Sequence, residues 1–355
     1  MTSQPVGIGI IGSGGIAQNA HMPAYKKLQD EGKVKIVAVS DVNPDVARAA
    51  AEKFDVPHQF TDYHDLLALS EIDAVDVCTP NFLHMQPTID ALDAGKHVLV
   101  EKPIALNAVE SQKMLDAAER NDRKLQVALN VRFGGVPQAV KRFIDQGKIG
   151  DIYYARAQAM RRRGVPGWGV FTQKDKQGGG PLIDIGVHIL DLTLWLMGYP
   201  EPKSVSGTSV TKFGTREGVL GLMGQWDPKK YTVEDFAVGL VKFKNGATLV
   251  LESSFIANIE RNVMRTEILG TEGGATVDPF DEAGAKIYRE ECGTLTDTTP
   301  VFLPKIGSYE AEIRAFVDAV AGDTPVAVPG EQALMVSRIL DAIYASSEQG
   351  KEIVF

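Results

Sequence analysis

The chain has 355 residues, more than one hydrophobic core usually serves, so we expect two domains. Apolar residues make up 44% and charged residues 23%, close to the average of globular proteins, which excludes a disordered tail, a collagen-like fibre and a disulfide miniprotein. With 37 basic and 46 acidic residues the net charge is −9, and the only tight basic cluster is Arg161–Arg163. We therefore expect neither nucleic acid nor an anionic membrane as a partner.

Two cysteines, Cys78 and Cys292, are too few for a disulfide framework and favour a reducing compartment. The segment Met1–Pro5 lacks the basic start and apolar core of a signal peptide. No apolar stretch comes near the roughly 18 residues that a membrane span requires. We therefore expect a soluble protein of the cytoplasm.

Residues 1–130 alternate short apolar runs with longer amphipathic ones. The expected strands are Val6–Ile11, Lys35–Ser40, Ala74–Cys78, His97–Val100 and Leu125–Leu129. The expected helices are Gly15–Leu28, Pro44–Lys53, Asp62–Leu69, His84–Ala94 and Ala108–Asn121. Strands and helices that alternate with short connections predict an α/β domain, a doubly wound parallel sheet covered on both faces.

The pattern changes in residues 131–355, which we expect to form a second domain. Its expected helices are Pro137–Gln146, the strongly apolar Pro181–Met197, Tyr309–Val320 and Gly330–Ser347. A strand is expected at Asp151–Met160, and mostly strands from Ser204 to Tyr288, with Asn245-Gly246 as a hairpin turn. Strands in a row predict an α+β domain built on a largely antiparallel sheet.

A glycine-rich turn follows the first expected strand and opens a helix. It consists of Gly12, Ser13, Gly14, Gly15, Ile16 and Ala17, and it matches G-x-G-x-x-A, a form of the dinucleotide-binding fingerprint. Gly12 permits the tight turn, Gly14 lets a pyrophosphate approach the backbone, and Ala17 allows close helix–strand packing. The helix N-terminus then meets the phosphate charge. The alternative is a tight turn without a ligand.

Asp41 ends the second expected strand. A carboxylate there can accept both ribose hydroxyls of an adenosine and repels a 2′-phosphate, which predicts NAD rather than NADP as the cofactor. Asp41 could instead cap the helix that begins near Pro44.

Two motifs end the fourth and fifth strands, the edge where ligands bind in open α/β sheets. They are Thr79-Pro80-Asn81 with His84, and Glu101-Lys102-Pro103. Together with the glycine turn, the segment Gly179–His188 and the block from Val233 to Ala247, they resemble the Gfo/Idh/MocA oxidoreductases in the right order over nearly the whole chain. Members of that family pair an N-terminal Rossmann domain with a C-terminal α/β domain that binds substrate and forms oligomers.

The resemblance implies catalytic and substrate-binding roles for Lys102, Asp184 and His188, with the substrate held between the two domains. An ammonium at Lys102 would polarise the reacting hydroxyl. Asp184 and His188 are four residues apart on a helix and share a face, and an imidazole suits removal of an alcohol proton. The alternatives are a surface lysine and a structural Asp–His pair. For Asp191, on the same helix, we expect a structural role.

Further cofactor contacts are implied by the same resemblance. They are Thr79, Pro80, Asn81, His84, Glu101, Lys102 itself and Asn130, which begins an Asn-x-Arg-Phe segment. Trp168, flanked by glycines, is expected to stack on a sugar ring of the substrate; simple packing is the alternative.

No metal site is expected. His58, Asp62 and His64 lie close in sequence but lack metal-ligand spacing, and a solvated surface explains them. No G-x-S-x-G elbow or Cys-His nucleophile appears, and Cys78 is interpreted as a buried strand residue.

These patterns predict an NAD-dependent dehydrogenase of a cyclic polyol or sugar, similar to inositol dehydrogenases. The alternatives are a redox-neutral, NAD-using glycoside-processing enzyme and a non-catalytic NAD or sugar sensor on the same fold. We expect a homodimer or homotetramer formed through the C-terminal sheet.

Overall fold

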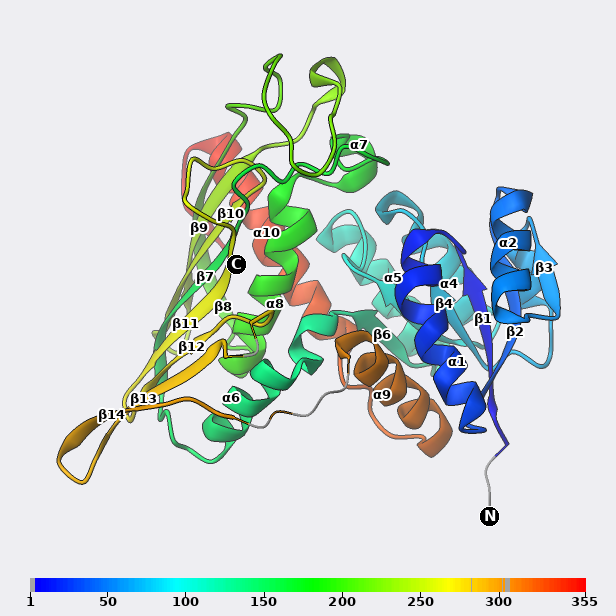
Figure 1. Ribbon diagram of the computed structural model, residues 1–355, viewed down its shortest axis with the longest axis horizontal. Helices are drawn as coiled ribbons and strands as arrows, with labels where there is room; N and C mark the ends of the chain where they lie inside the picture. The colour runs from blue at the N-terminus through cyan, green and yellow to red at the C-terminus, as the bar shows by residue number, and fades with distance from the viewer. Residues whose placement is uncertain (1–3, 282, 302, 304–306) are drawn as a thin grey trace. The chain divides into compact units, whose positions relative to one another are not determined.

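The computed structural model describes residues 4–281, 283–301, 303 and 307–355. These residues form two compact units (Figure 1). Unit 1 contains the residues up to Asn130 together with Gly307–Leu334, and unit 2 contains the remainder. The expected boundary after residue 130 coincides with the first division between units, whereas the expected second domain, 131–355, differs from unit 2 at Gly307–Leu334.

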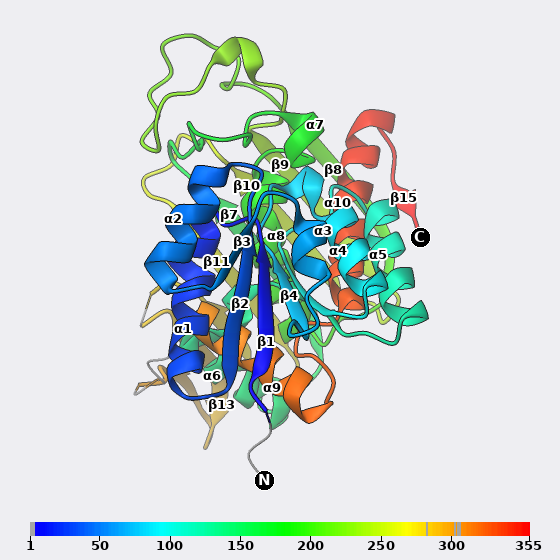
Figure 2. The ribbon, with the colours of Figure 1, turned by 90° about the vertical axis from the view of Figure 1, so that its right-hand side faces the viewer.

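Unit 1 is built on six parallel strands in the order β3-β2-β1-β4-β5-β6. The strands are β1 (Val6–Ile11), β2 (Val34–Ser40), β3 (His58–Phe60), β4 (Ala74–Val77), β5 (His97–Glu101) and β6 (Leu125–Ala128). Figure 2 shows β2, β1 and β4 side by side. This order is that of a Rossmann sheet, and it reverses between β1 and β4, where such sheets bind dinucleotides. The five expected strands are present, and the short β3 was not predicted.

The helices of unit 1 lie between these strands in the sequence, as expected, except for α9, which follows most of the sheet of unit 2. They are η1 (Ala17–His21), α1 (Met22–Asp30), α2 (Pro44–Phe54), α3 (Tyr63–Leu67), η2 (Asn81–Leu83), α4 (Met85–Asp93), α5 (Ala108–Arg120) and α9 (Ser308–Gly322). The expected helix Gly15–Leu28 is a π-helical turn, η1, continued by α1. Helix α9 packs on α1 and places Ile313, Phe316 and Val317 in the core of unit 1. An amphipathic pattern predicts such a helix but not which core it covers.

Unit 2 contains a nine-stranded sheet in the order β14-β13-β12-β11-β7-β10-β9-β8-β15. The strands are β7 (Ile152–Met160), β8 (Pro202–Val210), β9 (Phe236–Phe243), β10 (Thr248–Ser254), β11 (Val263–Gly270), β12 (Gly274–Val277), β13 (Ala285–Glu291), β14 (Thr294–Thr298) and β15 (Ile353–Val354). Within the described part of this sheet, only β7 and β10 pair in parallel. The predicted fold class is therefore confirmed, and β9 and β10 join at the expected turn, where Gly246 has a φ of +90°.

Helices of unit 2 cover one face of this sheet (Figure 1). They are α6 (Gly135–Asp145), α7 (Lys174–Gln177), η4 (Leu182–Gly186), α8 (Val187–Leu196) and α10 (Gly330–Gln349), with the short turns η3 (Asn130–Phe133) and η5 (Pro228–Lys230). Helix α10, which begins in unit 1, packs Ile343 against Gly207 and Gly239 of neighbouring strands. A Cβ on Gly239 would lie 2.5 Å from Cδ1 of Ile343, so the glycines make room for the helix.

The helical stretch Lys174–Leu196 is long and apolar enough to cross a membrane by length and composition. The expectation that no apolar segment approaches this length is therefore wrong. However, 89% of its apolar window is buried inside the structure, as in a core helix.

Candidate active site

The glycine turn lies between the end of β1 and η1, and its glycines serve different purposes. Gly12 has a φ of +86°, and a Cβ there would lie 2.8 Å from the backbone of Cys78 and Thr79, so only glycine fits. A Cβ on Gly14 would meet no atom within 4 Å. Gly12 is thus required by the fold, whereas the space beside Gly14 is open to a ligand.

Ser13 tests whether a dinucleotide fits this turn. Its hydroxyl is buried and has no hydrogen-bond partner among the described residues. A buried hydroxyl without a partner costs free energy, and the oxygens of a pyrophosphate would accept its hydrogen bond. Gly15 and Ile16 then lead into η1, with Ala17 fully buried as the packing role requires. The residues of the turn therefore fit the phosphates of a dinucleotide.

Asp41 directly follows β2, and its carboxylate contacts the glycine turn. Its Oδ2 accepts a hydrogen bond from the Ser13 backbone N–H (3.1 Å), and its Oδ1 accepts one from the Asn43 N–H (2.9 Å). Asn43, not Asp41, caps α2, because its side chain accepts from the Asp45 N–H. The alternative that Asp41 caps this helix is therefore wrong. A carboxylate has about four acceptor positions, so Asp41 keeps capacity for ribose hydroxyls.

His84 joins the two motifs at the ends of β4 and β5. The imidazole is buried, with Nδ1 2.7 Å from the Pro103 carbonyl oxygen and Nε2 2.8 Å from that of Thr79. Burial lowers its pKa, and the two carbonyl contacts oppose this shift without cancelling it. His84 therefore ties Thr79-Pro80-Asn81 to Glu101-Lys102-Pro103, and its predicted contact with the cofactor stays a prediction. Pro80 is exposed, and Thr79 and Asn81 are half-buried.

Glu101 and Lys102 lie at the carboxyl end of β5. The Glu101 carboxylate is buried and accepts hydrogen bonds from the Lys102 backbone N–H (2.9 Å) and, at its other oxygen, from Nε2 of His21 (2.9 Å). Burial would raise the Glu101 pKa, but the hydrogen bond and charge of His21 and the charge of Lys102 outweigh it, so the pKa is lowered. Lys102 is half-buried, so its charge stands next to an ionised Glu101.

Asn130 ends unit 1 and is buried, and its side-chain amide donates to the Ser308 hydroxyl (3.1 Å). Arg132, two residues on, forms a buried ion pair with Asp191 of α8, in which its Nε lies 3.1 Å from Oδ2. Tyr199 completes this cluster through its hydroxyl. The structural role expected for Asp191 is thus confirmed.

Asp184 and His188 belong to the apolar helix of unit 2. Asp184 lies in the π-helical turn η4, and His188 lies in the first turn of α8. Every residue from Pro181 to Leu194 is described, and His188 alone among them is not buried. His188 is thus half-buried in a segment, 181–194, whose other residues are all enclosed, which is where a group that meets a ligand must lie. π-Helical turns occur often at functional sites.

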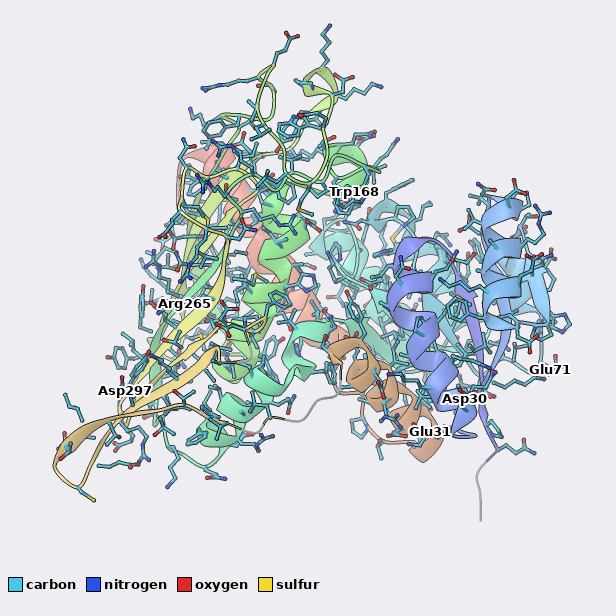
Figure 3. All side chains as sticks on the ribbon, in the orientation of Figure 1. Asp30, Glu31, Glu71, Trp168, Arg265 and Asp297 are labelled. Carbon is cyan, nitrogen blue, oxygen red and sulfur yellow. The ribbon has the colours of Figure 1, made fainter. Side chains whose placement is uncertain are left out.

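Two residues between β7 and α7, Arg161 and Trp168, also bear on the site in unit 2. Arg161 places Nη1 3.5 Å from Oδ2 of Asp184 and lies over the ring of Phe255. The sequence offered no sign of this pair, because Arg161 stood in a run of three arginines. Trp168, labelled in Figure 3, lies on the loop before α7, is 55% exposed and meets Phe171 edge to face. Its predicted stacking on a sugar stays a prediction.

The residues dismissed as a metal site have other tasks. Asp62 caps α3 by accepting from the His64 N–H, and His64 is exposed, while His58 is an exposed residue of β3. A second group escaped the sequence interpretation altogether: His21, Asp76 and Cys78, buried together in unit 1.

Comparison with known proteins identifies the family. Residues 6–129 match the family model described as "Oxidoreductase family, NAD-binding Rossmann fold", and residues 141–355 match "Oxidoreductase family, C-terminal alpha/beta domain". The chain belongs to the Gfo/Idh/MocA oxidoreductase family. As predicted, it is an NAD-binding oxidoreductase with an N-terminal Rossmann domain and a C-terminal α/β domain.

Three relatives show how far the similarity extends. The D-glucoside 3-dehydrogenase of Escherichia coli (strain K12) is 37% identical over 354 residues, which cover 99% of this chain and 98% of that protein. The levoglucosan dehydrogenase of Pseudarthrobacter phenanthrenivorans is 31% identical over 76% of this chain and 73% of that protein. A solved structure of levoglucosan dehydrogenase in complex with NADH and levoglucosan has a TM-score of 0.86 and 26% identity and covers 99% of both chains. These members of the family are sugar dehydrogenases.

Proposed function

We propose that this Gfo/Idh/MocA oxidoreductase oxidises a ring hydroxyl of a cyclic sugar or polyol with NAD⁺, and that its substrates are glycosides. The proposal rests above all on His188, the one open position of the buried segment 181–194, four residues after Asp184. The choice of glycosides is supported by the full-length similarity to the D-glucoside 3-dehydrogenase.

Three side chains carry the reaction in this proposal. His188 accepts the proton of the reacting hydroxyl. Asp184, whose carboxylate is held near Arg161, orients the imidazole or a neighbouring hydroxyl of the sugar. Lys102 polarises the reacting oxygen. Bound NAD⁺ supplies the hydride acceptor.

The cofactor contacts are proposed for the residues of the glycine turn, for Asp41 and for the two strand-end motifs. Gly12–Ala17 would hold the pyrophosphate, and Asp41 would accept hydrogen bonds from the ribose. Thr79, Pro80, Asn81, His84, Glu101, Lys102 and Asn130 would line the nicotinamide half. Trp168 would stack on the sugar.

NADH absorbance with a panel of methyl glucosides, free glucose, levoglucosan and myo-inositol tests this function. We expect turnover with NAD⁺ to be fastest with a glucoside. Preference for myo-inositol would overturn the choice of glycosides, and no turnover with any compound would overturn the dehydrogenase. NAD that is released only when the protein is denatured, together with glycoside conversion that needs no added NAD⁺, would instead favour the redox-neutral alternative.

We also propose a homodimer or homotetramer, located in the cytoplasm. On the face of the unit 2 sheet that its helices leave open, Leu240, Val250, Arg156 and Glu267 form one row across four strands, a mixture of apolar and charged groups suited to a second copy. Both cysteines are free, which suits a reducing compartment. Light scattering at micromolar concentration should give a multiple of 38.4 kDa, and Leu240→Lys should lower it. A wild-type monomer would contradict the interface.

A further inference from the structure

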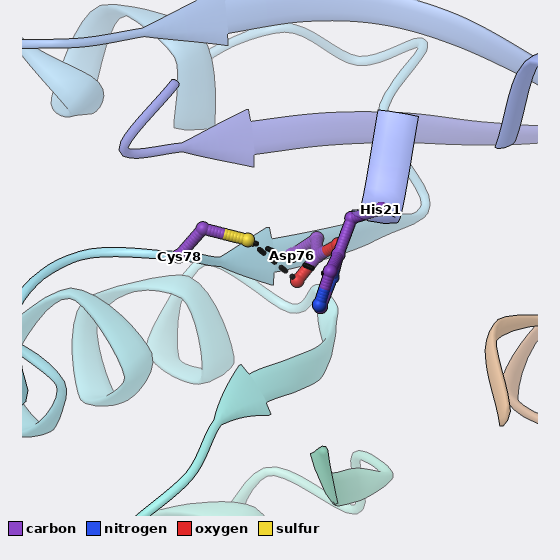
Figure 4. Close-up of side chains that lie close together, drawn as sticks. All are labelled: His21, Asp76 and Cys78. Carbon is purple, nitrogen blue, oxygen red and sulfur yellow. Dashed lines mark hydrogen bonds and ion pairs between the residues drawn. The ribbon is translucent and has the colours of Figure 1, made fainter. Parts of the chain in front are cut away.

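His21 ends the π-helical turn that follows the glycine turn, and its side chain has no exposure to solvent. Its Nδ1 lies 2.7 Å from Oδ2 of Asp76 on β4, and its Nε2 lies 2.9 Å from Oε1 of Glu101 on β5. Figure 4 shows His21 beside Asp76 and Cys78. One imidazole thus joins the first helix of unit 1 to the two strands on which the cofactor edge is built.

The contacts of His21 define its charge. An ionised carboxylate only accepts hydrogen bonds, so an imidazole between two carboxylates must donate from both nitrogens and is therefore protonated. Burial lowers the pKa of His21, but the charge of Asp76 and the groups around it outweigh burial and raise the pKa well above its usual value. With Lys102 beside Glu101, two cations then balance two buried carboxylates.

Every element around the ring supports this protonated state. Asp76 and Cys78 face it from β4, and Glu101 faces it from β5. The ring of Tyr309 on α9 lies 5.7 Å away, and Tyr25 of α1 stands near Asp76. The two tyrosines are neutral phenols, and burial raises the pKa of the Cys78 thiol to about 12, so Cys78 is neutral as well. Of these five groups only the two carboxylates are charged, so both oppose the loss of a proton from His21.

A metal ion is a weaker explanation of the same cluster. The ligand atoms of His21, Asp76 and Cys78 do lie within 4.8 Å of one another. Yet both imidazole nitrogens already contact carboxylates at hydrogen-bond distance, and the Cys78 thiol donates to Oδ1 of Asp76 (3.4 Å). A metal would need a deprotonated thiol and a nitrogen taken from a charged hydrogen bond.

The second oxygen of Glu101 gives the cluster a consequence for catalysis. Oε1 accepts from His21, and Oε2 accepts from the backbone N–H of Lys102. The orientation of Glu101 therefore sets the backbone from which the lysine side chain projects. On the other side, η1 begins at Ala17, the last residue of the glycine turn.

We propose that His21 is a positioning residue: as a permanently protonated clamp it holds Glu101, and through it Lys102, in register with the glycine turn. The proposal rests on the proposed function in one respect, that Lys102 acts on the substrate. Without the imidazolium, Asp76 and Glu101 are two like charges in a buried space, and they move apart or take up a proton. Their separation displaces the backbone of Lys102, whereas a proton on one carboxyl removes the repulsion and lets the backbone keep its position.

His21→Gln tests the clamp, with His97→Gln as the matched control. His97 begins the same strand β5 at its far end, where its ring accepts from the Lys124 N–H. In His21→Gln we expect kcat per NADH-binding site to fall by on the order of 10²-fold, the cost of a small misplacement of a reacting group. The NADH dissociation constant should change much less than kcat, because Gly12–Ala17 and Asp41 keep their places. His97→Gln should keep the wild-type kcat.

Charge and pH separate positioning from mere structural support. The ratio of the His21→Gln kcat to the wild-type kcat at the same pH should rise as pH falls, because a proton on one carboxyl replaces the missing cation. The double variant His21→Gln/Asp76→Asn, which removes one negative charge, should recover kcat at neutral pH. A His21→Gln variant that melts at a lower temperature yet keeps the wild-type kcat and pH profile would overturn the proposal.

Two measurements on the wild type keep the test decisive even if the variants fold poorly. Nitrogen chemical shifts of labelled histidine should show one ring with both nitrogens protonated beyond pH 8. A His21 ring that loses a proton near its ordinary pKa would overturn the clamp, and so would one bound metal ion per chain by mass spectrometry. Because these signals do not depend on turnover, an enzyme inactive on every sugar would count against the proposed function alone.

Discussion

Each unit contains a histidine at a π-helical turn, and the two side chains are held in opposite ways. His21 closes the turn η1 of unit 1, has no exposure and contacts a carboxylate at each ring nitrogen. His188 follows the turn η4 of unit 2 and is the only residue from Pro181 to Leu194, all of them described, that is not buried. Burial between two carboxylates locks an imidazole in one protonation state, whereas an imidazole that is not fully buried can meet a substrate hydroxyl. The first arrangement suits holding a structure and the second suits acid–base chemistry.

The largest expected effect comes from the open histidine. Replacing His188 with Ala should lower kcat by on the order of 10²–10⁴, the range for loss of a general base. The affinity for NAD⁺ should hardly change, because the dinucleotide-binding turn lies in unit 1. Steady-state kinetics and a fluorescence titration with NADH measure the two quantities. If the affinity collapsed while kcat held, His188 would be a structural residue and the contrast with His21 would fail.

Sequence reasoning found what lies close together along the chain and missed what folding brings together. The turn Gly12–Ala17 and the pair Asp184 and His188 could be predicted because each lies within a few positions. His21 escaped notice because its partners Asp76 and Glu101 are 55 and 80 positions away. Arg161 escaped in the same way, 23 positions before Asp184.

The fold shows the same limit. Strands buried on both faces, such as β1, and β4 apart from Asp76, are apolar and were recognised from composition. Helix α9 was also predicted, but its attachment to unit 1 depends on the shape of the surface between β1 and α1. The edge strands β3, β14 and β15 are short and mostly exposed, so they lack the apolar pattern by which a strand is predicted.

Two glycines of the cofactor turn extend the contrast between groups that hold the fold and groups that meet a ligand. Gly12→Ala should destabilise the protein by about 2 kcal/mol or more, because it combines a positive φ with a backbone clash. Gly14→Ala should change the free energy of unfolding by no more than about 0.5 kcal/mol relative to wild type, since the new methyl meets no atom within 4 Å. It should nevertheless weaken NADH binding about tenfold or more, because the methyl occupies the space for the pyrophosphate. Urea denaturation and an NADH titration of both variants measure these effects. Equal NADH affinity of Gly14→Ala and the wild type would mean that no cofactor approaches this point.

The carboxylates Asp76 and Asp41 show the same contrast between a group that holds the fold and a group that meets a ligand. Asp76 is buried against His21, whereas Asp41 is half-buried and accepts from two backbone N–H groups. Val42 and Asn43 offer no cation beside it, and Arg48 pairs with Asp45. The wild type should therefore prefer NAD⁺ over NADP⁺ in kcat/KM by at least about tenfold, because a 2′-phosphate would meet a carboxylate. Asp41→Ala should narrow that gap, while equal use of both cofactors by the wild type would show that Asp41 faces away from the ribose.

The smallest expected effect concerns pH and compares His21 with His84, the other fully buried histidine described in unit 1. Burial lowers the pKa of His84 in the folded protein below its ordinary value of about 6.5. Between these two pKa values the unfolded chain binds more protons than the folded protein. The stability that His84 gives above pH 6.5 is therefore lost as pH falls. The pKa of His21 is raised, so the stability that it gives is complete below pH 6.5 and is lost as pH rises through the folded value. The difference in unfolding free energy between wild type and His84→Gln should thus shrink toward acid pH. The difference between wild type and His21→Gln should shrink toward alkaline pH. Each should change by at most about 1.4 kcal/mol per pH unit, the limit for one proton. Urea denaturation from pH 5 to 9 measures both differences, with His97→Gln as the reference. Two differences that change with pH in the same direction would mean that the carboxylates do not hold His21 in its charged form. The contrast drawn above between His21 and His188 would then lose its physical basis.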